Sequence, residues 1–245
     1  MLPYFNFQKI ALGPVNLQIW GIFFALALIV SSIIFLKNIQ NKHINSDAGL
    51  EFIIWLIISI IVGARVGYVI SHLNEYKNII DIFKIWQGGL AMLGGLIGGL
   101  VAAMIFARYK KINFFTVADS MAPAVAVGIA IGRTGCYLVG EHLGKATNFF
   151  LGVKYNNQVV HQTALYEIFI SLIIFAILTF LSKKKLKSGA IFTIFLLLYA
   201  IGRFIIEYFR INEPAYLFFT YTQWICLIII IISAAIVKRR SFLKS

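Results

Sequence analysis

Charged residues interrupt several strongly apolar stretches of this chain. They are Arg65, Arg133, Glu167, Arg203 and Glu207. A charged side chain near the centre of a bilayer costs about 2.5–3.5 kcal/mol or more, so such residues are usually paired, hydrated or functional. Guanidinium groups bind phosphate oxygens in a bidentate manner. Arginines that outnumber the carboxylates therefore predict a site for an anionic ligand that carries a phosphate.

The spacing near the last of these residues indicates a shared helix face. Tyr199, Arg203, Glu207 and Arg210 follow one another at steps of four, four and three residues, which places them on one side of a helix. A simpler interpretation is that Arg203 and Glu207 only neutralise each other. That interpretation stays open for the pair, but it leaves Arg65 and Arg133 unexplained.

Composition indicates the environment of these charges. Of the 245 residues, 60% are hydrophobic and 13% are charged, whereas soluble domains carry about 25% charged residues. The net charge of +13 could suggest nucleic acid. The basic residues, however, lie in short clusters between apolar runs, as they do in membrane proteins, so we expect no nucleic-acid partner.

Seven apolar runs are long enough for transmembrane helices, which need about 20 residues each. They cover residues 19–36, 50–72, 89–109, 118–138, 162–181, 188–210 and 220–237. The first run is interpreted as a retained helix, because no cleavage site for a signal peptidase follows it. The expected fold is all-α: a polytopic bundle of seven transmembrane helices in a single domain, residues 1–245. Cys136 and Cys226 lie inside apolar runs, so we expect no disulfide.

The basic clusters predict the orientation. The richer ones follow the first, third, fifth and seventh runs: Lys37 and Lys42; Arg108, Lys110 and Lys111; Lys183, Lys184, Lys185 and Lys187; and Lys238, Arg239, Arg240 and Lys244. The positive-inside rule then predicts an external N-terminus and a cytoplasmic C-terminus. The loop 139–161 lies outside, and its residues 149–155 could be extended. All five intramembrane charges fall in the outer half of the bilayer, where phospholipid head groups are the available anions.

Glycines cluster where the third helix begins: Gly88, Gly89, Gly94, Gly95, Gly98 and Gly99. Small residues at these spacings let helices approach closely. Close approach of the backbone to a lipid is the alternative.

Five segments stand in an order that is typical of one family. They are GARVGY (63–68), GGLAMLGGLIGG (88–99), GRTGCYLVGEHLG (132–144), HQTALYE (161–167) and YAIGRFIIEYFR (199–210). Together with LGPVNLQIWG (12–21), they resemble the prolipoprotein diacylglyceryl transferases of bacterial membranes. The family signature runs roughly G-R-x-G-N-F-x-N-x-E-x-x-G, and Gly132, Arg133, Gly135, Glu141 and Gly144 match it.

The chain departs from the family at polar positions. Cys136 and Val139 replace the two asparagines of the signature, and Leu93 stands where the family usually has a histidine. Gln162, Thr163 and Ala164 replace Pro, Ser and Gln. These departures concern the group that would help to activate an incoming thiol.

The resemblance implies an enzyme of the bacterial cytoplasmic (inner) membrane, with its active site toward the extracytoplasmic leaflet. The implied reaction moves the diacylglyceryl group of phosphatidylglycerol to the lipobox cysteine of a preprolipoprotein. A thioether forms and glycerol-1-phosphate leaves. We expect no metal or redox cofactor, since the leaving group needs only stabilisation of its negative charge.

The implied catalytic residues are Arg133 and Arg203 for the phosphate, Glu207 to orient Arg203, and Glu141 to bind the glycerol hydroxyls or hold Arg133. The implied substrate-binding residues are Arg65, Tyr68, Gly94, Gly95, Gly135, Gly144, His161, Tyr166, Glu167, Tyr199 and Arg210. Arg65 would either have a structural role or help to bind the head group. Glu167 and Tyr166 would close the outer mouth of the site. His142 and His161 are expected to be hydrated or locally hydrogen-bonded. A zinc site made of Glu141, His142 and His161 would match no established ligand spacing.

Two other functions remain open. A diverged paralogue could transfer a lipid or head group to another acceptor, which the replaced polar residues favour. A transporter could use the arginines as an anion site, but transporters often contain inverted repeats, and none is evident here.

Overall fold

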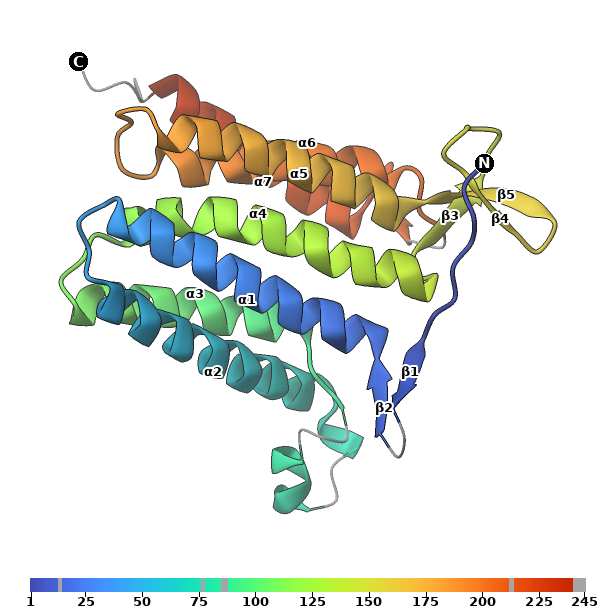
Figure 1. Cartoon of the computed structure of the whole chain (residues 1–245), viewed down its shortest axis with the longest axis horizontal. Helices are drawn as coiled ribbons and strands as arrows, with labels where there is room; N and C mark the ends of the chain where they lie inside the picture. The colour runs from blue at the N-terminus through green and yellow to red at the C-terminus, as the bar shows by residue number, and fades with distance from the viewer. Residues whose placement is uncertain (13–14, 76–77, 85–87, 212–213, 240–245) are drawn as a thin grey trace. The chain divides into compact units, whose positions relative to one another are not determined.

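The computed structural model describes residues 1–12, 15–75, 78–84, 88–211 and 214–239 (Figure 1). These residues form two compact units. The first unit combines residues 1–35 with residues 118–245, and the second comprises residues 36–117. Each unit is described by itself, so the expectation of a single domain stays a prediction.

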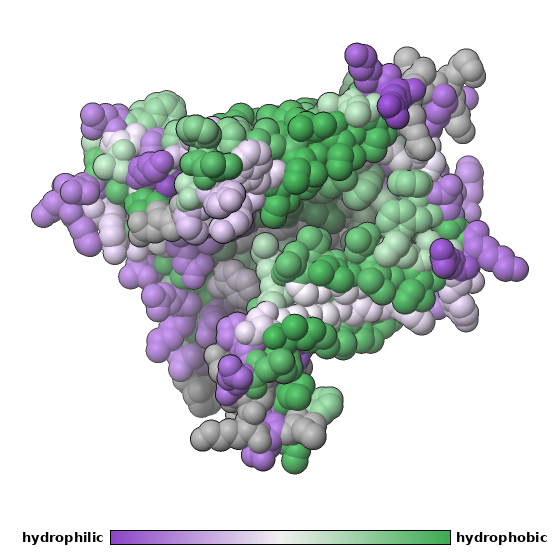
Figure 2. Space-filling model, turned by 180° about the vertical axis from the view of Figure 1, so that it is seen from behind, coloured by the Kyte–Doolittle hydropathy of each residue, from purple (hydrophilic) through white to green (hydrophobic). Residues whose placement is uncertain are grey.

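The helices confirm the predicted fold class. They are α1 (Ile19–Gln40), α2 (Ser46–Ser71), α3 (Met92–Tyr109), α4 (Phe114–Val139), α5 (Thr163–Ser182), α6 (Ala190–Glu207) and α7 (Tyr221–Arg239). All seven are long and apolar enough to cross a membrane, so this is a multi-pass membrane protein. In each unit, apolar side chains cover the middle of the helices, and hydrophilic side chains gather toward their ends (Figure 2).

Two helix boundaries differ from the predicted runs for local reasons. The third helix starts at Met92 instead of residue 89, because Gly88 and Gly89 have φ angles of +89° and +77°, which no α-helix contains. The sixth helix ends at Glu207, so Arg210 lies beyond it. Of the basic residues used to predict orientation, Arg240 and Lys244 lie outside the described residues.

In the first unit, α5, α6 and α7 lie side by side (Figure 1). A core of buried side chains joins α4, α5 and α6: Ala122, Ala126, Ile174, Leu178, Ile191 and Phe195. The buried Asp119 carboxylate of α4 accepts hydrogen bonds from the backbone N–H groups of Gly189 (2.7 Å) and Phe192 (2.8 Å). This carboxylate satisfies N–H groups at the start of α6 that lack partners within the helix.

Short strands extend from the same unit. The antiparallel sheet β3 (Leu143–Ala146), β5 (Gln158–Gln162) and β4 (Val153–Tyr155) lies between α4 and α5 in the chain. Two small hairpins are formed by β1 (Lys9–Leu12) with β2 (Val15–Gln18) and by β6 (Ala215–Tyr216) with β7 (Phe219–Thr220). Of the run 149–155 that was expected to be extended, only Val153–Tyr155 is a strand.

In the second unit, α2 and α3 pack through their glycines. A Cβ atom on Gly94 would overlap the Gly63 carbonyl oxygen, and one on Gly98 would overlap that of Ser59. The structure therefore supports helix packing as the role of these glycines. The short 3₁₀ helices Leu73–Glu75 and Ile79–Phe83 precede α3.

Candidate active site

An arginine–glutamate cluster forms where α4, α5 and α6 meet; it comprises Arg133, Glu167, Arg203 and Glu207. Glu167 lies between the two arginines: its Oε2 is 2.5 Å from Arg133 Nε, and its Oε1 accepts from Arg203 Nη1 at 2.8 Å. Arg203 Nη2 also lies 2.9 Å from Glu207 Oε2. The structure thus brings these four predicted residues together from three helices.

Burial divides the arginine–glutamate cluster into two layers. The side chains of Glu167 and Glu207 are only 5% and 0% exposed, whereas those of Arg133 and Arg203 are 24% and 14% exposed. The negative charges are therefore buried, and the positive groups reach the accessible edge. Such an edge suits the binding of an anion.

Arg210 approaches the arginine–glutamate cluster from the turn that follows α6. Its Nε is 4.0 Å from Glu207 Oε2. An antiparallel bridge between Gly144 and Arg210 holds this turn against β3, and a Cβ atom on Gly144 would overlap the Phe209 carbonyl oxygen. The predicted shared face is thus only partly a helix face, because Arg210 is positioned by the turn. Tyr199 packs on Phe195, with ring centroids 5.8 Å apart.

The loop after α4 adds a histidine that sequence analysis did not assign to the site. His142 Nε2 lies 3.0 Å from Arg133 Nη1. Burial of the imidazole and the charges of Arg133, Arg210 and Arg203, in that order, lower the pKa of His142 to about 4. The sequence contained a hint of this role, because His142 stands beside Glu141 in the signature segment. Its contact with Arg133, however, is seen only in the folded chain.

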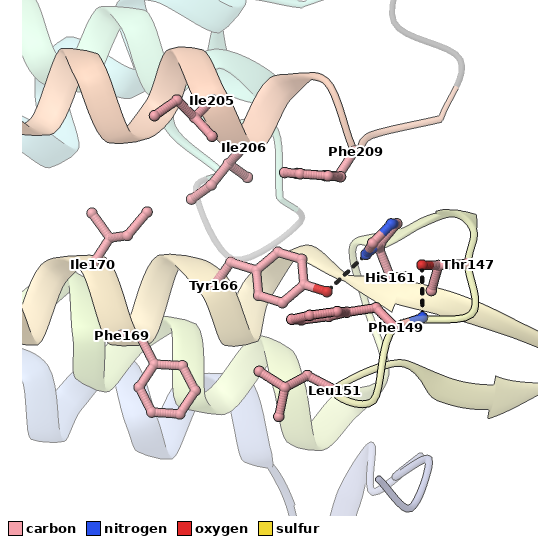
Figure 3. Close-up of a pocket in the computed structure, with 10 residues that line it drawn as sticks. All are labelled: Thr147, Phe149, Leu151, His161, Tyr166, Phe169, Ile170, Ile205, Ile206 and Phe209. Atoms are coloured by element: carbon pink, nitrogen blue, oxygen red, sulfur yellow. Dashed lines mark hydrogen bonds between the residues drawn. The ribbon is translucent and has the colours of Figure 1, made fainter. Parts of the chain in front are cut away.

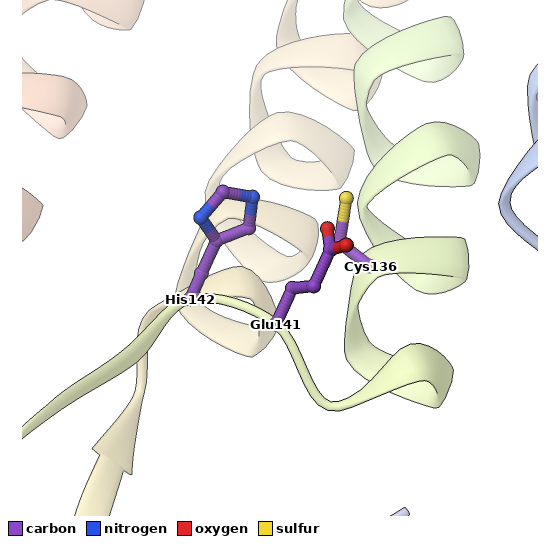
Figure 4. Close-up of side chains that lie close together, drawn as sticks. All are labelled: Cys136, Glu141 and His142. Carbon is purple, nitrogen blue, oxygen red and sulfur yellow. The ribbon is translucent and has the colours of Figure 1, made fainter. Parts of the chain in front are cut away.

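Cys136, Glu141 and His142 could together hold a metal ion, because their ligand atoms lie within 4.8 Å of one another (Figure 4). This set differs from the zinc set considered above, since His161 instead bonds to Tyr166. Nε2 of His142 already accepts a hydrogen bond from Arg133. The positive charges of the arginines around that imidazole would repel a metal cation. The arrangement therefore fits an anion better than a metal. In the described part of the chain, no ion pair joins Glu141 to Arg133.

An apolar pocket of about 540 Å³ lies between α5, α6 and the loop that follows β3. Figure 3 shows Ile170 of α5 pointing toward Ile205 and Ile206 of α6, whereas Phe169 projects from the other side of α5. At one end, His161 Nδ1 lies 2.7 Å from the Tyr166 hydroxyl, and burial lowers the pKa of His161. Tyr166 thus lies at this pocket, whereas Glu167 is buried between arginines and does not lie at the mouth as expected.

Other predicted site residues support the local structure. Arg65, which is 8% exposed, donates to the carbonyl oxygens of Ile82 (2.6 Å), Gly88 (2.6 Å), Gly89 (3.0 Å) and Asp81 (2.8 Å) in the second unit. It therefore holds the segment before α3 in place.

The remaining predicted residues also make local contacts. Tyr68 stacks on His72, with ring centroids 4.1 Å apart, and Gly95 packs on Ile60. Gly135 contacts Phe23 of α1. Any part that Arg65, Tyr68, Gly94 or Gly95 takes in substrate binding stays a prediction.

Comparison with known proteins adds independent evidence. The family model for prolipoprotein diacylglyceryl transferase matches residues 8–239. Proteins named phosphatidylglycerol–prolipoprotein diacylglyceryl transferase are similar to the chain. The relative from Listeria innocua is 31% identical over 94% of this chain and 88% of its own length. The relative from Synechocystis sp. is 37% identical over 82% of this chain and 80% of its own length. The chain therefore belongs to the prolipoprotein diacylglyceryl transferase family.

Proposed function

We propose that this protein transfers the diacylglyceryl group of phosphatidylglycerol to the thiol of a lipobox cysteine in a preprolipoprotein. Family membership and the names of the relatives support this reaction. The observation that carries the site assignment is the arginine–glutamate cluster, in which two guanidinium groups from separate helices share the buried Glu167 and keep accessible edges.

Arg133 and Arg203 bind the phosphate of the lipid and stabilise the charge that develops on it. In the reaction, a new bond forms between the thiol sulfur and the terminal glyceryl carbon. The bond from that carbon to the phosphate oxygen breaks, and glycerol-1-phosphate leaves with the electron pair. Donors that are already oriented toward developing charge stabilise a transition state strongly. Glu167 and Glu207 orient the two arginines for this task.

The apolar pocket is suited to an acyl chain of the lipid, because Phe and Ile side chains of α5, α6 and the loop after β3 line it. Such a lining keeps the chain in an apolar environment while the arginines bind the phosphate. Tyr166 and His161 also line this pocket. The charge pattern supports a site toward the extracytoplasmic leaflet of the bacterial inner membrane.

The second candidate is transfer of a lipid or head group to a different acceptor. Its support is specific: Cys136 and Val139 replace polar residues of the family signature, and Leu93 replaces a histidine.

The test combines purified protein, phosphatidylglycerol and a lipobox peptide, and measures the mass of the peptide. We expect a diacylglyceryl gain on cysteine. Arg133→Ala and Arg203→Ala should each lower the rate by about 10²–10³-fold, as loss of a charge-stabilising donor does. Arg108→Ala, at the exposed end of α3, is the matched control and should retain activity.

Two results would contradict parts of this proposal. Full activity of both cluster variants would remove the arginines from the site. An intact protein that modifies no lipobox peptide, yet consumes phosphatidylglycerol with another acceptor, would favour the second candidate.

A further inference from the structure

The buried carboxylate of Glu207 has a neighbour on each of its two oxygens. Oε2 lies 2.9 Å from Arg203 Nη2, and Oε1 accepts a hydrogen bond from the Thr220 hydroxyl at 3.3 Å. Glu207 is the last residue of α6, where the carbonyl groups of the helix end disfavour a negative charge. One carboxylate thus joins an arginine of the arginine–glutamate cluster to the residue that precedes α7.

Thr220 also caps α7, which begins at Tyr221. Its backbone N–H donates to Gln223 Oε1 (3.0 Å), and its hydroxyl oxygen accepts from the backbone N–H of Gln223 (3.2 Å). This reciprocal arrangement is a capping box, which satisfies backbone N–H groups that have no partner inside the helix. It also fixes the Thr220 side chain, because the hydroxyl cannot rotate away without losing its bond to Gln223.

The capping box determines where the hydroxyl proton of Thr220 points. A hydroxyl donates one hydrogen bond and can accept two. Because a backbone N–H can only donate, the oxygen is the acceptor toward Gln223, and the hydroxyl proton stays available. An ionised carboxylate can only accept, so this proton points to Glu207 Oε1. Hydrogen bonds to charged groups are stronger than those between neutral groups, so this bond holds the carboxylate in one orientation.

Packing keeps the start of α7 against α6, and the two helices lie side by side (Figure 1). Phe219 of β7 contacts both Phe204 of α6 and Trp224 of α7, with ring centroids 5.5 and 5.4 Å apart. The buried Gln223 amide donates to the Phe204 carbonyl oxygen at 3.5 Å. The hydroxyl of Thr220 is therefore held in place by contacts with both helices.

We propose that Thr220 is a positioning residue for the transfer reaction; this inference rests on the proposed function. Two carboxylates hold the guanidinium group of Arg203, with Glu167 at Nη1 and Glu207 at Nη2. The Thr220 hydroxyl fixes the second of them and acts on Arg203 without touching the substrate. Donors that are already oriented toward developing charge stabilise a transition state, so an arginine that is held loosely stabilises it less.

The decisive variant is Thr220→Gly. Glycine caps helices about as well as threonine, so α7 should stay folded, but the donor to Glu207 is lost. We expect kcat for transfer to the lipobox peptide to fall by about tenfold, the scale of one hydrogen bond to a charged group. KM for phosphatidylglycerol should change less, since the lost orientation matters most in the transition state.

Three further single variants control this result. Thr220→Ser keeps the hydroxyl and should retain most of the wild-type kcat. Thr220→Ala removes the same donor as Thr220→Gly and should lower kcat to the same extent. Thr222→Ala is the matched control, because it removes a hydroxyl from the same turn of α7 that makes no hydrogen bond to Glu207 in the described part of the chain.

A double variant tests whether Thr220 acts through Glu207. Glu207→Gln replaces the charged acceptor with a neutral one, which accepts a weaker hydrogen bond. Thr220→Gly should therefore lower kcat by a smaller factor when Glu207→Gln is also present. Equal factors in the two backgrounds would overturn the inference, because residues that act independently have additive effects on free energy.

Thermal unfolding in detergent separates positioning from folding. A lower kcat at a nearly unchanged unfolding temperature supports the inference. A lower unfolding temperature with unchanged kcat would leave Thr220 as a helix cap only, and a Thr220→Ser variant as slow as Thr220→Gly would show that the hydroxyl is not the group that matters; either overturns it. A wild-type protein that transfers nothing to the peptide would instead refute the proposed function, and the inference would fail with it.

Discussion

Glu167 is the residue on which both arginines of the site depend. Its two oxygens contact groups from α4 and α6, and its side chain is 5% exposed. Breaking a buried ion pair by removing one partner leaves an uncompensated charge. The single carboxylate thus couples the position of Arg133 to that of Arg203.

We therefore expect Glu167→Ala to destabilise the protein by about 3–5 kcal/mol, the usual result for a broken buried pair, and to abolish transfer. Glu167→Gln keeps the shape and one acceptor, and should destabilise less. Thermal unfolding in detergent, together with the peptide assay, measures both effects. If Glu167→Ala unfolds at the wild-type temperature, the buried pairing described here is incorrect.

At the scale of elements, the contact of α2 with α3 depends on the absence of side chains. Gly63, Gly94 and Gly98 place the two backbones so close that a Cβ atom would overlap a carbonyl oxygen. Without a hydrophobic driving force between helices in lipid, such close packing is a main source of helix association.

Gly98→Ala should accordingly destabilise the protein by about 1–3 kcal/mol, as overpacking does. Gly21→Ala is the matched control: nothing lies within 4 Å of its added Cβ, and alanine favours helix by up to about 1 kcal/mol. The unfolding temperature of Gly98→Ala should therefore fall, whereas that of Gly21→Ala should stay unchanged or rise. Equal shifts would contradict the close packing.

For the whole molecule, the charge pattern predicts which ends face the cytoplasm. The loop between α5 and α6 contains several exposed lysines, whereas the loop between α4 and α5 contains few basic residues. Positively charged loops remain cytoplasmic. The active site would then lie toward the outer leaflet.

Single-cysteine labelling of intact cells checks this topology. Asn156→Cys, in the exposed loop between β4 and β5, should react with a membrane-impermeant thiol reagent. Lys185→Cys should react only after the membrane is permeabilised. The unaltered protein serves as the background, since Cys136 and Cys226 are both buried. The opposite labelling pattern would reverse the orientation.

The amino-acid sequence by itself determined the class of fold and the family. A bilayer requires long apolar runs whatever the neighbouring helices are, so seven helices could be placed within a few residues. Motifs such as GRTGCYLVGEHLG are contiguous, and a resemblance can be recognised without coordinates. Helix ends were less predictable, because they depend on contacts such as those of Arg65 with the carbonyl groups before α3.

The spacing of four residues already indicated the pair of Arg203 with Glu207, but only the tertiary structure decided which charges of different elements meet. Glu167 was expected at the outer mouth, but it lies buried between Arg133 and Arg203. His142 was expected to be hydrated or locally hydrogen-bonded; the structure shows a local hydrogen bond and identifies its partner as Arg133, nine residues earlier. These pairings join residues of separate helices and loops, and their free energy depends on distance and burial. Neither quantity exists until the helices have packed, so no spacing along the chain could have supplied it.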